Sequence, residues 1–147
     1  MQNFNPIFGL VPDAKVGGAI IGANANTATD GTGSNTYKIY DAGTEGSFIS
    51  FVRFKPVSSP AATVIRLWLC TDTGTFTAGT TNTAVNTTMI GEITAAAWTP
   101  SNTQSSIGYE IPVGFPIGAS QKLLVTFGTS TGAGTTGYNP LTVAMKY

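Results

Sequence analysis

The sequence contains no histidine, a single cysteine and few charges, with seven basic and seven acidic residues among 147. Histidine, cysteine and clustered carboxylates carry most proton transfer, metal binding and nucleophilic attack in enzymes, so their scarcity leaves few candidates for catalysis. Cys70 has no partner for an internal disulfide, which suits a protein made in a reducing cytoplasm. Because it lies in an alternating apolar run, we expect Cys70 to be a small packed side chain.

The charges balance and form no basic run, so the electrostatic footprint of a nucleic-acid-binding protein is missing. We therefore discount DNA and RNA as direct partners. The first ten residues lack the basic start and apolar centre of a secretory signal. No stretch reaches the roughly 18 continuous apolar residues of a membrane-spanning helix. The sequence thus predicts a soluble, unprocessed protein with no membrane partner.

Threonine and glycine are abundant instead, with 24 and 18 residues. Threonine favours strands and glycine favours turns. An apolar fraction of 41% argues against disorder, and the length suits one domain. The composition indicates a rigid β protein whose function is contact.

Apolar residues recur at every second position in short runs that end at Gly, Pro, Asn or Asp, which is the pattern of β-strands. The eight predicted strands are 19–25, 37–41, 47–55, 63–70, 89–95, 109–113, 122–128 and 141–146. In the last of them, Leu141, Val143 and Met145 alternate with smaller or polar residues, as in a half-buried strand. With no helical period, this pattern predicts an all-β fold, an antiparallel two-sheet β-sandwich with the jelly roll as leading topology.

Residues 1–18 contain two prolines and do not alternate like a strand of the same sandwich. We therefore divide the chain into an extended N-terminal arm, residues 1–18, and a β-sandwich domain, residues 19–147. Two alternatives stay open: the arm packs on its own domain, or it lies along a neighbouring subunit. The apolar residues of the arm that are candidates for such contacts are Phe4, Ile7, Phe8, Leu10 and Val11.

Three carboxylates are the remaining candidates for catalysis. Asp72-Thr73-Gly74 follows an apolar run, as in aspartic proteases, but the same tripeptide is ordinary turn chemistry. Glu92 and Glu110 lie on separate predicted strands. If the two carboxylates lie close together, they can hydrolyse a glycosidic bond. The alternative is that each forms a cross-strand ion pair with Lys or Arg. The aspartates do not recur at calcium-loop spacing. We favour the turn and the ion pairs, and predict no catalytic residue, no metal site and no cofactor.

Aromatic side chains offer another kind of site. Trp68 shares a predicted strand face with Arg66, and Trp98 could join them in a platform on which a sugar ring stacks. The alternative is ordinary packing between sheets, or stacking of Arg66 on Trp68. The candidate ligand face is therefore Arg66, Trp68 and Trp98.

A series of motifs runs from about Asn5 to Tyr147. The motifs are Asn5-Pro6-Ile7-Phe8, Asp30-Gly31-Thr32-Gly33, Glu45-Gly46-Ser47-Phe48-Ile49, Val52-Arg53-Phe54, Ile65-Arg66-Leu67-Trp68-Leu69, the loop Ala84 to Thr88, Gly91-Glu92-Ile93, Tyr109-Glu110-Ile111-Pro112, Phe115-Pro116-Ile117-Gly118 and Leu123-Leu124-Val125-Thr126-Phe127-Gly128. In this order the sequence resembles a family of small tailed-phage virion proteins, described as head decoration, cement or auxiliary capsid proteins. It departs from the family in its last five residues and in a longer loop at residues 132–134.

The resemblance implies a jelly roll, or a related sandwich, on the outer surface of a capsid, often as an oligomer for which a trimer is the guess. It also implies the major capsid protein as partner, a virion location and synthesis in the host cytoplasm. It brings no catalytic residues. We therefore expect a non-enzymatic virion protein that decorates or cements the capsid and stabilises it. The alternative is a tail-associated, fibre-associated or carbohydrate-binding sandwich module that uses the Trp68 face.

Overall fold

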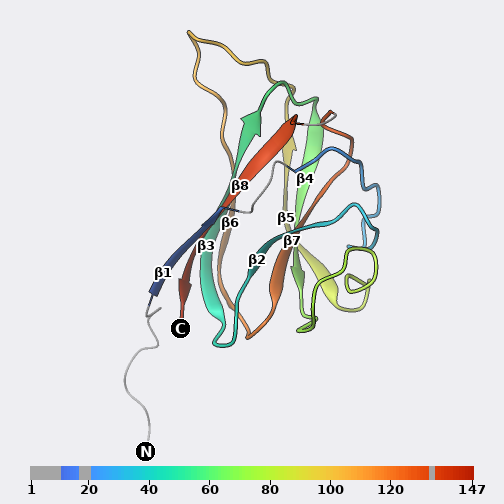
Figure 1. Ribbon diagram of the computed structural model, residues 1–147, viewed down its shortest axis with the longest axis vertical. Helices are drawn as coiled ribbons and strands as arrows, with labels where there is room; N and C mark the ends of the chain where they lie inside the picture. Colours follow the sequence, from blue (N-terminus) through green and yellow to red (C-terminus); the bar gives the residue numbers. More distant parts are fainter. Residues whose placement is uncertain (1–10, 17–20, 133–134) are drawn as a thin grey trace, which may run out of the picture.

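The computed structural model describes residues 11–16, 21–132 and 135–147. The strands found in these ranges are β1 Val11–Val16, β2 Tyr37–Asp41, β3 Ser47–Val57, β4 Thr63–Cys70, β5 Thr87–Ala95, β6 Tyr109–Ile117, β7 Lys122–Phe127 and β8 Gly137–Lys146. They form two four-stranded antiparallel sheets that face each other (Figure 1). In the described ranges no helix is long and apolar enough to cross a membrane.

Sheet 1 has the strand order β1-β8-β3-β6, and sheet 2 has the order β2-β7-β4-β5. Most neighbours are therefore distant in sequence; β8, for example, lies between β1 and β3. This order is the double Greek key of a jelly roll. The predicted antiparallel two-sheet sandwich and its leading topology are confirmed.

The core lies between the two sheets, because each sheet turns one set of alternating side chains inward. Fully buried residues include Ile49, Val52 and Phe54 from sheet 1 and Leu123, Val125 and Phe127 from sheet 2. The ring of Tyr138 stacks on Phe127 with centroids 5.7 Å apart. The hydroxyl of Tyr138 is buried without a hydrogen-bond partner among the described residues, and burial raises the pKa of Tyr138 to about 12.

The first predicted strand, residues 19–25, is wrong. Ile21 makes only an isolated bridge with Tyr138, residues 22–25 form no strand, and residues 17–20 lie outside the described ranges. Gly22 interrupts the apolar run that suggests a strand. Its φ of +114° is left-handed, and a Cβ at this position would clash with the side chain of Thr131.

The first strand of the sandwich is instead Val11–Val16, which is part of the segment that the sequence assigns to the arm. It pairs with β8 in continuous register, from Val11 opposite Lys146 to Val16 opposite Leu141. The prediction that residues 1–18 lie outside the sandwich is therefore wrong for these six residues. An edge strand has one free side, so it tolerates Pro12 and needs little apolar alternation.

Two of the later strands, β6 and β8, are longer than predicted. β6 continues to Ile117 and β8 already begins at Gly137. In β6 the sequence suggested an end near Gly114, which has a left-handed φ of +70°. A bulge in the pairing with β3, between Ile49 and Phe51, absorbs this residue and lets the strand continue.

Candidate interaction surfaces

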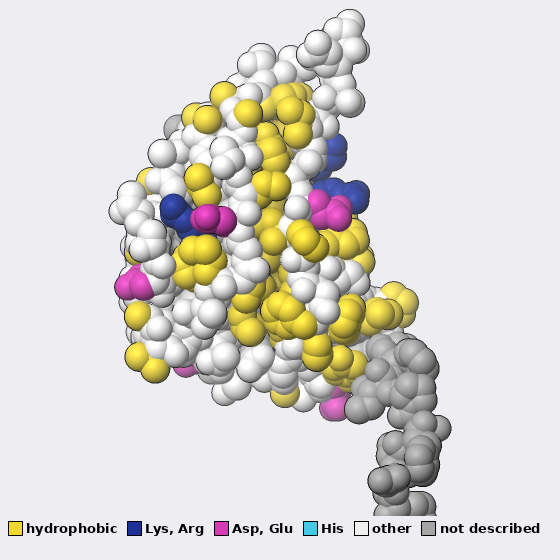
Figure 2. All heavy atoms as spheres, turned by 180° about the vertical axis from the view of Figure 1, so that it is seen from behind, with side chains coloured by type: hydrophobic (Ala, Val, Ile, Leu, Met, Phe, Trp, Pro, Cys, Tyr) yellow, Lys and Arg dark blue, Asp and Glu magenta, His cyan; other side chains and the backbone are white. Residues whose placement is uncertain are grey.

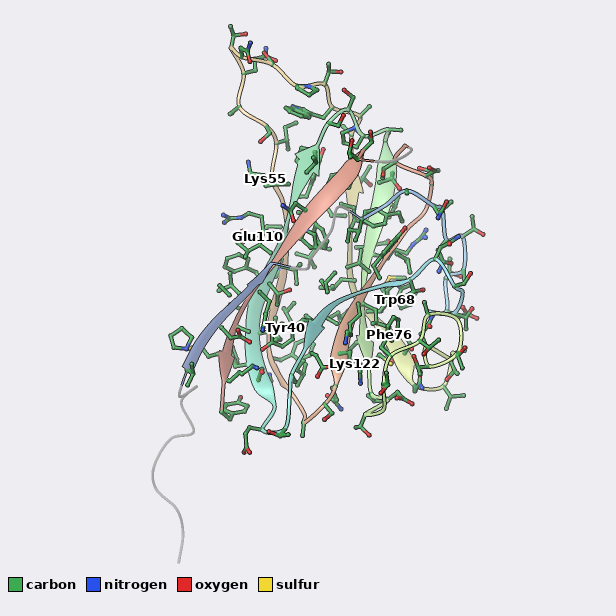
Figure 3. The ribbon with its side chains drawn as sticks, viewed as in Figure 1. Tyr40, Lys55, Trp68, Phe76, Glu110 and Lys122 are labelled. Atoms are coloured by element: carbon green, nitrogen blue, oxygen red, sulfur yellow. The ribbon has the colours of Figure 1, made fainter. Side chains whose placement is uncertain are left out.

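The side chain of Trp68 is buried, with only 1% of its surface exposed. It packs on the outer side of sheet 2 with Cys70, Leu124 and the partly buried Phe76 and Met89 (Figure 3). Its indole Nε1–H donates a hydrogen bond of 3.0 Å to Thr126 Oγ1. Neither ring face is free for a sugar, so Trp68 is a packing residue in this structure.

Two loops cover this part of sheet 2, and buried amides hold them together. Asn82 Nδ2 donates to the carbonyl oxygens of Gly31 at 2.8 Å and Gly33 at 3.1 Å. Gly31 has a left-handed φ of +81°, and a Cβ there would clash with the side chain of Thr87. These hydrogen bonds tie the connection between β4 and β5 to the loop before β2, and the two loops together cover Trp68.

The structure does not bring the other two ligand-face candidates together with an exposed Trp68. Arg66 lies opposite Glu92, with Nε 3.6 Å from Oε2, and its Nη1 is buried without a partner among the described residues. Trp98 lies beyond the end of β5, where its backbone N–H donates to the carbonyl oxygen of Pro60. Arg66, Trp68 and Trp98 therefore form no aromatic platform.

Asp72 has the turn geometry expected of Asp-Thr-Gly. Its Oδ1 accepts a hydrogen bond of 2.8 Å from the N–H of Gly74, and its carbonyl oxygen accepts one of 2.7 Å from Lys122 Nζ. The ammonium of Lys122, a residue only 2% exposed, also donates to the carbonyl oxygen of Ser120. Lys122 and Asp72 thus anchor the start of the loop that covers Trp68.

Glu92 and Glu110 are both in cross-strand ion pairs. Glu110 Oε2 lies 2.9 Å from Arg53 on sheet 1, whereas Glu92 pairs with Arg66 on the outer side of sheet 2. Figure 2 shows charged side chains confined to a few spots on the back of the molecule. Because the two carboxylates lie on different sheets, they do not flank one bond. Among the described residues no three potential metal ligands gather either.

The outer face of sheet 1 is apolar, which sets it apart from an ordinary solvent-facing sheet. In β8 the buried Thr142 and Ala144 face the core, so the larger Leu141, Val143 and Met145 face outward. In β3 the buried Val52 separates Phe51 from Arg53. The exposed or half-exposed apolar residues of this face, called here the apolar face, are Pro12, Ala14, Phe48, Phe51, Pro112, Pro116, Leu141, Val143 and Met145.

The strand register joins these side chains into one continuous surface. Phe48 lies between Met145 on β8 and Pro116 on β6, and Phe51 lies between Val143 and Pro112. Directly opposite residues on neighbouring strands have Cβ atoms about 5 Å apart. The apolar face therefore spans the sheet from strand to strand.

The charges on the apolar face are few, and Arg53 and Glu110 pair with each other. Arg53 and Glu110 are each 45% exposed, and the guanidinium of Arg53 lies 5.3 Å from the ring centre of Phe51. Lys55 donates to Ser106 in the connection between β5 and β6, which projects at the top of Figure 1. These contacts leave the middle of the face electrically neutral.

The sequence did not single out the apolar face. The available signal was in β3, where Phe48, Ile49, Phe51, Val52 and Phe54 are apolar on both faces of the strand. Of the five predicted arm contacts, Phe4, Ile7, Phe8 and Leu10 lie outside the described residues. Val11 begins β1 at the edge of sheet 1 and is 57% exposed.

No family model matches the chain, and no curated protein matches it. Among solved structures, the chain is similar to a chain from the crystal structure of the T13 IBDV viral particle, with 14% sequence identity and a TM-score of 0.38. The similarity covers 99% of this protein and 35% of the viral chain, so this protein spans about a third of the length of the viral chain. A likeness at this level assigns no family.

Proposed function

We propose that this protein is a non-enzymatic structural protein of a virion, and that it binds the outer surface of a capsid through its apolar face. The partner is then the major capsid protein, and the location is the capsid surface. The sequence resemblance to head decoration proteins supports this function. The observation that carries it is the continuous apolar surface across sheet 1.

An apolar outer sheet face is costly to leave in water and gains free energy when a partner covers it. The four strands of sheet 1 contain 36 residues, and at about 3.3 Å rise and about 4.8 Å spacing they give a flat footprint of roughly 600 Å². This approaches the roughly 800 Å² that each partner contributes to a standard protein interface. One such contact per subunit is sufficient when many copies bind one shell as linked oligomers.

The carbohydrate-binding alternative depended on an exposed aromatic platform. The burial of Trp68 under its loop removes the central ring of that platform. The apolar face has two phenylalanines but few hydrogen-bond donors, whereas sugar sites combine ring faces with several polar groups. Attachment to protein therefore accounts better for this surface.

The test mixes the purified protein with capsids assembled without it, followed by sedimentation. We expect saturable binding at a fixed ratio to the major capsid protein. Val143→Asp places a charge in the middle of the apolar face and should reduce binding at least tenfold, since a desolvated unpaired carboxylate costs more than about 1.4 kcal/mol.

Thr94→Asp is the matched control, because Thr94 is exposed on β5 of the opposite sheet and receives the same charge. It should bind like the wild type. Both variants are first checked for cooperative thermal unfolding. Equal binding by Val143→Asp and Thr94→Asp, or no saturable binding by the wild type, would contradict the proposal.

A further inference from the structure

A second surface lies at the open edge of the sandwich, between the edge strands β1 and β2. The opposite edge is closed more tightly by β5 and β6. The open edge contains a cleft of about 410 Å³, within the size range of ligand sites. Its lining includes three lysines, Lys15 from β1, Lys38 from β2 and Lys146 from β8.

This gathering of lysines is unusual for a chain with only seven basic residues. The other four have partners elsewhere: Arg53 pairs with Glu110, Arg66 pairs with Glu92, Lys55 donates to Ser106, and the buried Lys122 donates to two carbonyl oxygens. Three of the seven basic side chains are therefore gathered at one cleft.

The carboxylates beside the cleft do not neutralise it. Lys38 lies 3.5 Å from Asp41, and Lys146 lies 3.6 Å from Asp13, so each of these ammonium groups has one loose ion pair. Both aspartates have other partners, since Asp41 Oδ1 accepts from the N–H of Gly43 and Asp13 Oδ2 lies 3.0 Å from the Tyr40 hydroxyl.

Lys15 makes no ion pair with any described carboxylate. The residues outside the described ranges contain no aspartate or glutamate, so the chain has no other acidic side chain for it. Lys15 lies opposite the inward-facing Thr142, which directs its side chain toward the gap between the sheets. The cleft thus has an excess of one positive charge and several unused N–H donors.

We propose that this cleft binds carboxylate groups presented by an extended acidic segment of a partner protein. Lys15 supplies an ammonium group with no ion pair for one carboxylate, and the loosely paired Lys38 and Lys146 have N–H donors left for a second. Among the described residues no strand pairs with the outer edge of β1 or of β2, and such edges offer backbone groups to which an extended segment can hydrogen-bond. A nucleic acid would need a longer basic track than three lysines supply.

The test uses the isolated chain of residues 1–147, so its result is independent of shell binding. Citrate is titrated at constant ionic strength while NMR signals of the lysine ε-CH₂ groups are followed. We expect saturable shifts at Lys15, Lys38 and Lys146. Lys55, which lies far along the long axis from Tyr40 in Figure 3, should shift only weakly. Equal shifts at Lys55, or no saturation, would overturn the proposal.

Lys15→Ala should weaken citrate binding about three- to tenfold, the effect of losing one charge-assisted hydrogen bond in a partly exposed site. Lys55→Ala is the matched control and should leave binding unchanged. An edge lysine can also serve only to block strand pairing between copies. Unchanged citrate binding combined with self-association of Lys15→Ala would assign that role to Lys15 and overturn the proposal.

A peptide pair distinguishes a protein partner from a small carboxylate. The first peptide contains two glutamates separated by one residue, so that both side chains extend to the same side of an extended segment. The second has glutamine at both positions. Tighter binding of the glutamate peptide than of citrate, with no binding of the glutamine peptide, supports the proposal. Binding of citrate alone would contradict a polypeptide partner.

Discussion

The phenolic oxygen of Tyr40 on β2 lies 3.0 Å from Oδ2 of Asp13 on β1, and this contact joins the edge strands of the two sheets. The same oxygen lies 2.8 Å from Ser47 Oγ on β3. The hydroxyl is protonated at neutral pH and acts as a donor, and burial raises the pKa of Tyr40 to about 12, so it keeps its proton in alkaline solution too. Tyr40 therefore holds the edge strand β1 against the opposite sheet.

Tyr40→Phe should lower the free energy of unfolding by about 1–2 kcal/mol, because it removes a buried hydroxyl with two polar neighbours. Hydrogen exchange of the β1 amides should also speed up, since the tie to Asp13 is lost. Urea denaturation measures the first effect. Tyr37→Phe on the same strand is the control, because Tyr37 is half-exposed. Equal stability of the two variants would show that the contact with Asp13 contributes nothing.

Alkaline pH should destabilise the protein. The pKa of Tyr40 and of Tyr138 is raised from 10.0 to about 12 in the folded state, mainly by burial. The folded protein thus keeps both protons at a pH where the unfolded chain loses them, so stability is fully present below pH 10 and falls as pH rises toward about 12.

The variant Tyr138→Phe isolates one of these two groups. At neutral pH it should unfold within about 1 kcal/mol of the wild type, because the Tyr138 hydroxyl has no partner among the described residues. Between pH 10 and 12 its midpoint should decline less steeply than that of the wild type. A parallel decline of both proteins would show that Tyr138 does not contribute to the pH dependence.

Gly31→Ala should destabilise the protein by several kcal/mol more than Gly114→Ala. Both glycines have left-handed φ angles, +81° and +70°, so both variants carry the backbone cost of a side chain there. Only at Gly31 does the added Cβ meet Thr87 and the ring of Trp68, whereas Gly114 has nothing within 4 Å. Thermal unfolding compares the pair, and equal losses would mean that the loop adjusts without cost.

Trp68→Ala should lower the free energy of unfolding by about 3–5 kcal/mol, as expected for removal of a buried indole. The measurement is chemical denaturation, together with a glycan-binding assay. Trp98→Ala is the comparison, because Trp98 is half-buried in a connection. A stable Trp68→Ala variant that had lost glycan binding would restore the carbohydrate-binding alternative.

Deletion of residues 2–10 tests the arm without touching β1. We expect a folded protein that attaches to capsids more weakly, because Phe4, Ile7, Phe8 and Leu10 are the apolar candidates for contact. Deletion of residues 2–16 is the contrasting variant, since it removes β1 and Asp13 and should destabilise the sandwich. Full attachment after the shorter deletion would show that these four residues are not capsid contacts.

The strands with strong alternation could be predicted from the sequence. Residues 37–41 and 63–70 were placed within the observed bounds of β2 and β4, because alternating burial leaves a direct mark on the pattern. β1 could not be predicted, because Pro12, Asp13 and Lys15 break the alternation of apolar and polar residues. This strand is defined by its pairing with β8, which is distant in the sequence. The burial of Trp68 depends on a loop that follows it by several residues, and no local pattern reports that contact.

By itself the sequence determined that this chain is a β protein with few reactive groups, because composition and period two follow directly from side-chain chemistry. The tertiary structure decided which apolar residues face water. In β8 the small Thr142 and Ala144 face the core while Leu141 and Val143 face outward, and large buried side chains such as Phe54 and Phe127 from other strands fill that core. The pairing of distant strands likewise brought Lys15, Lys38 and Lys146 to one cleft.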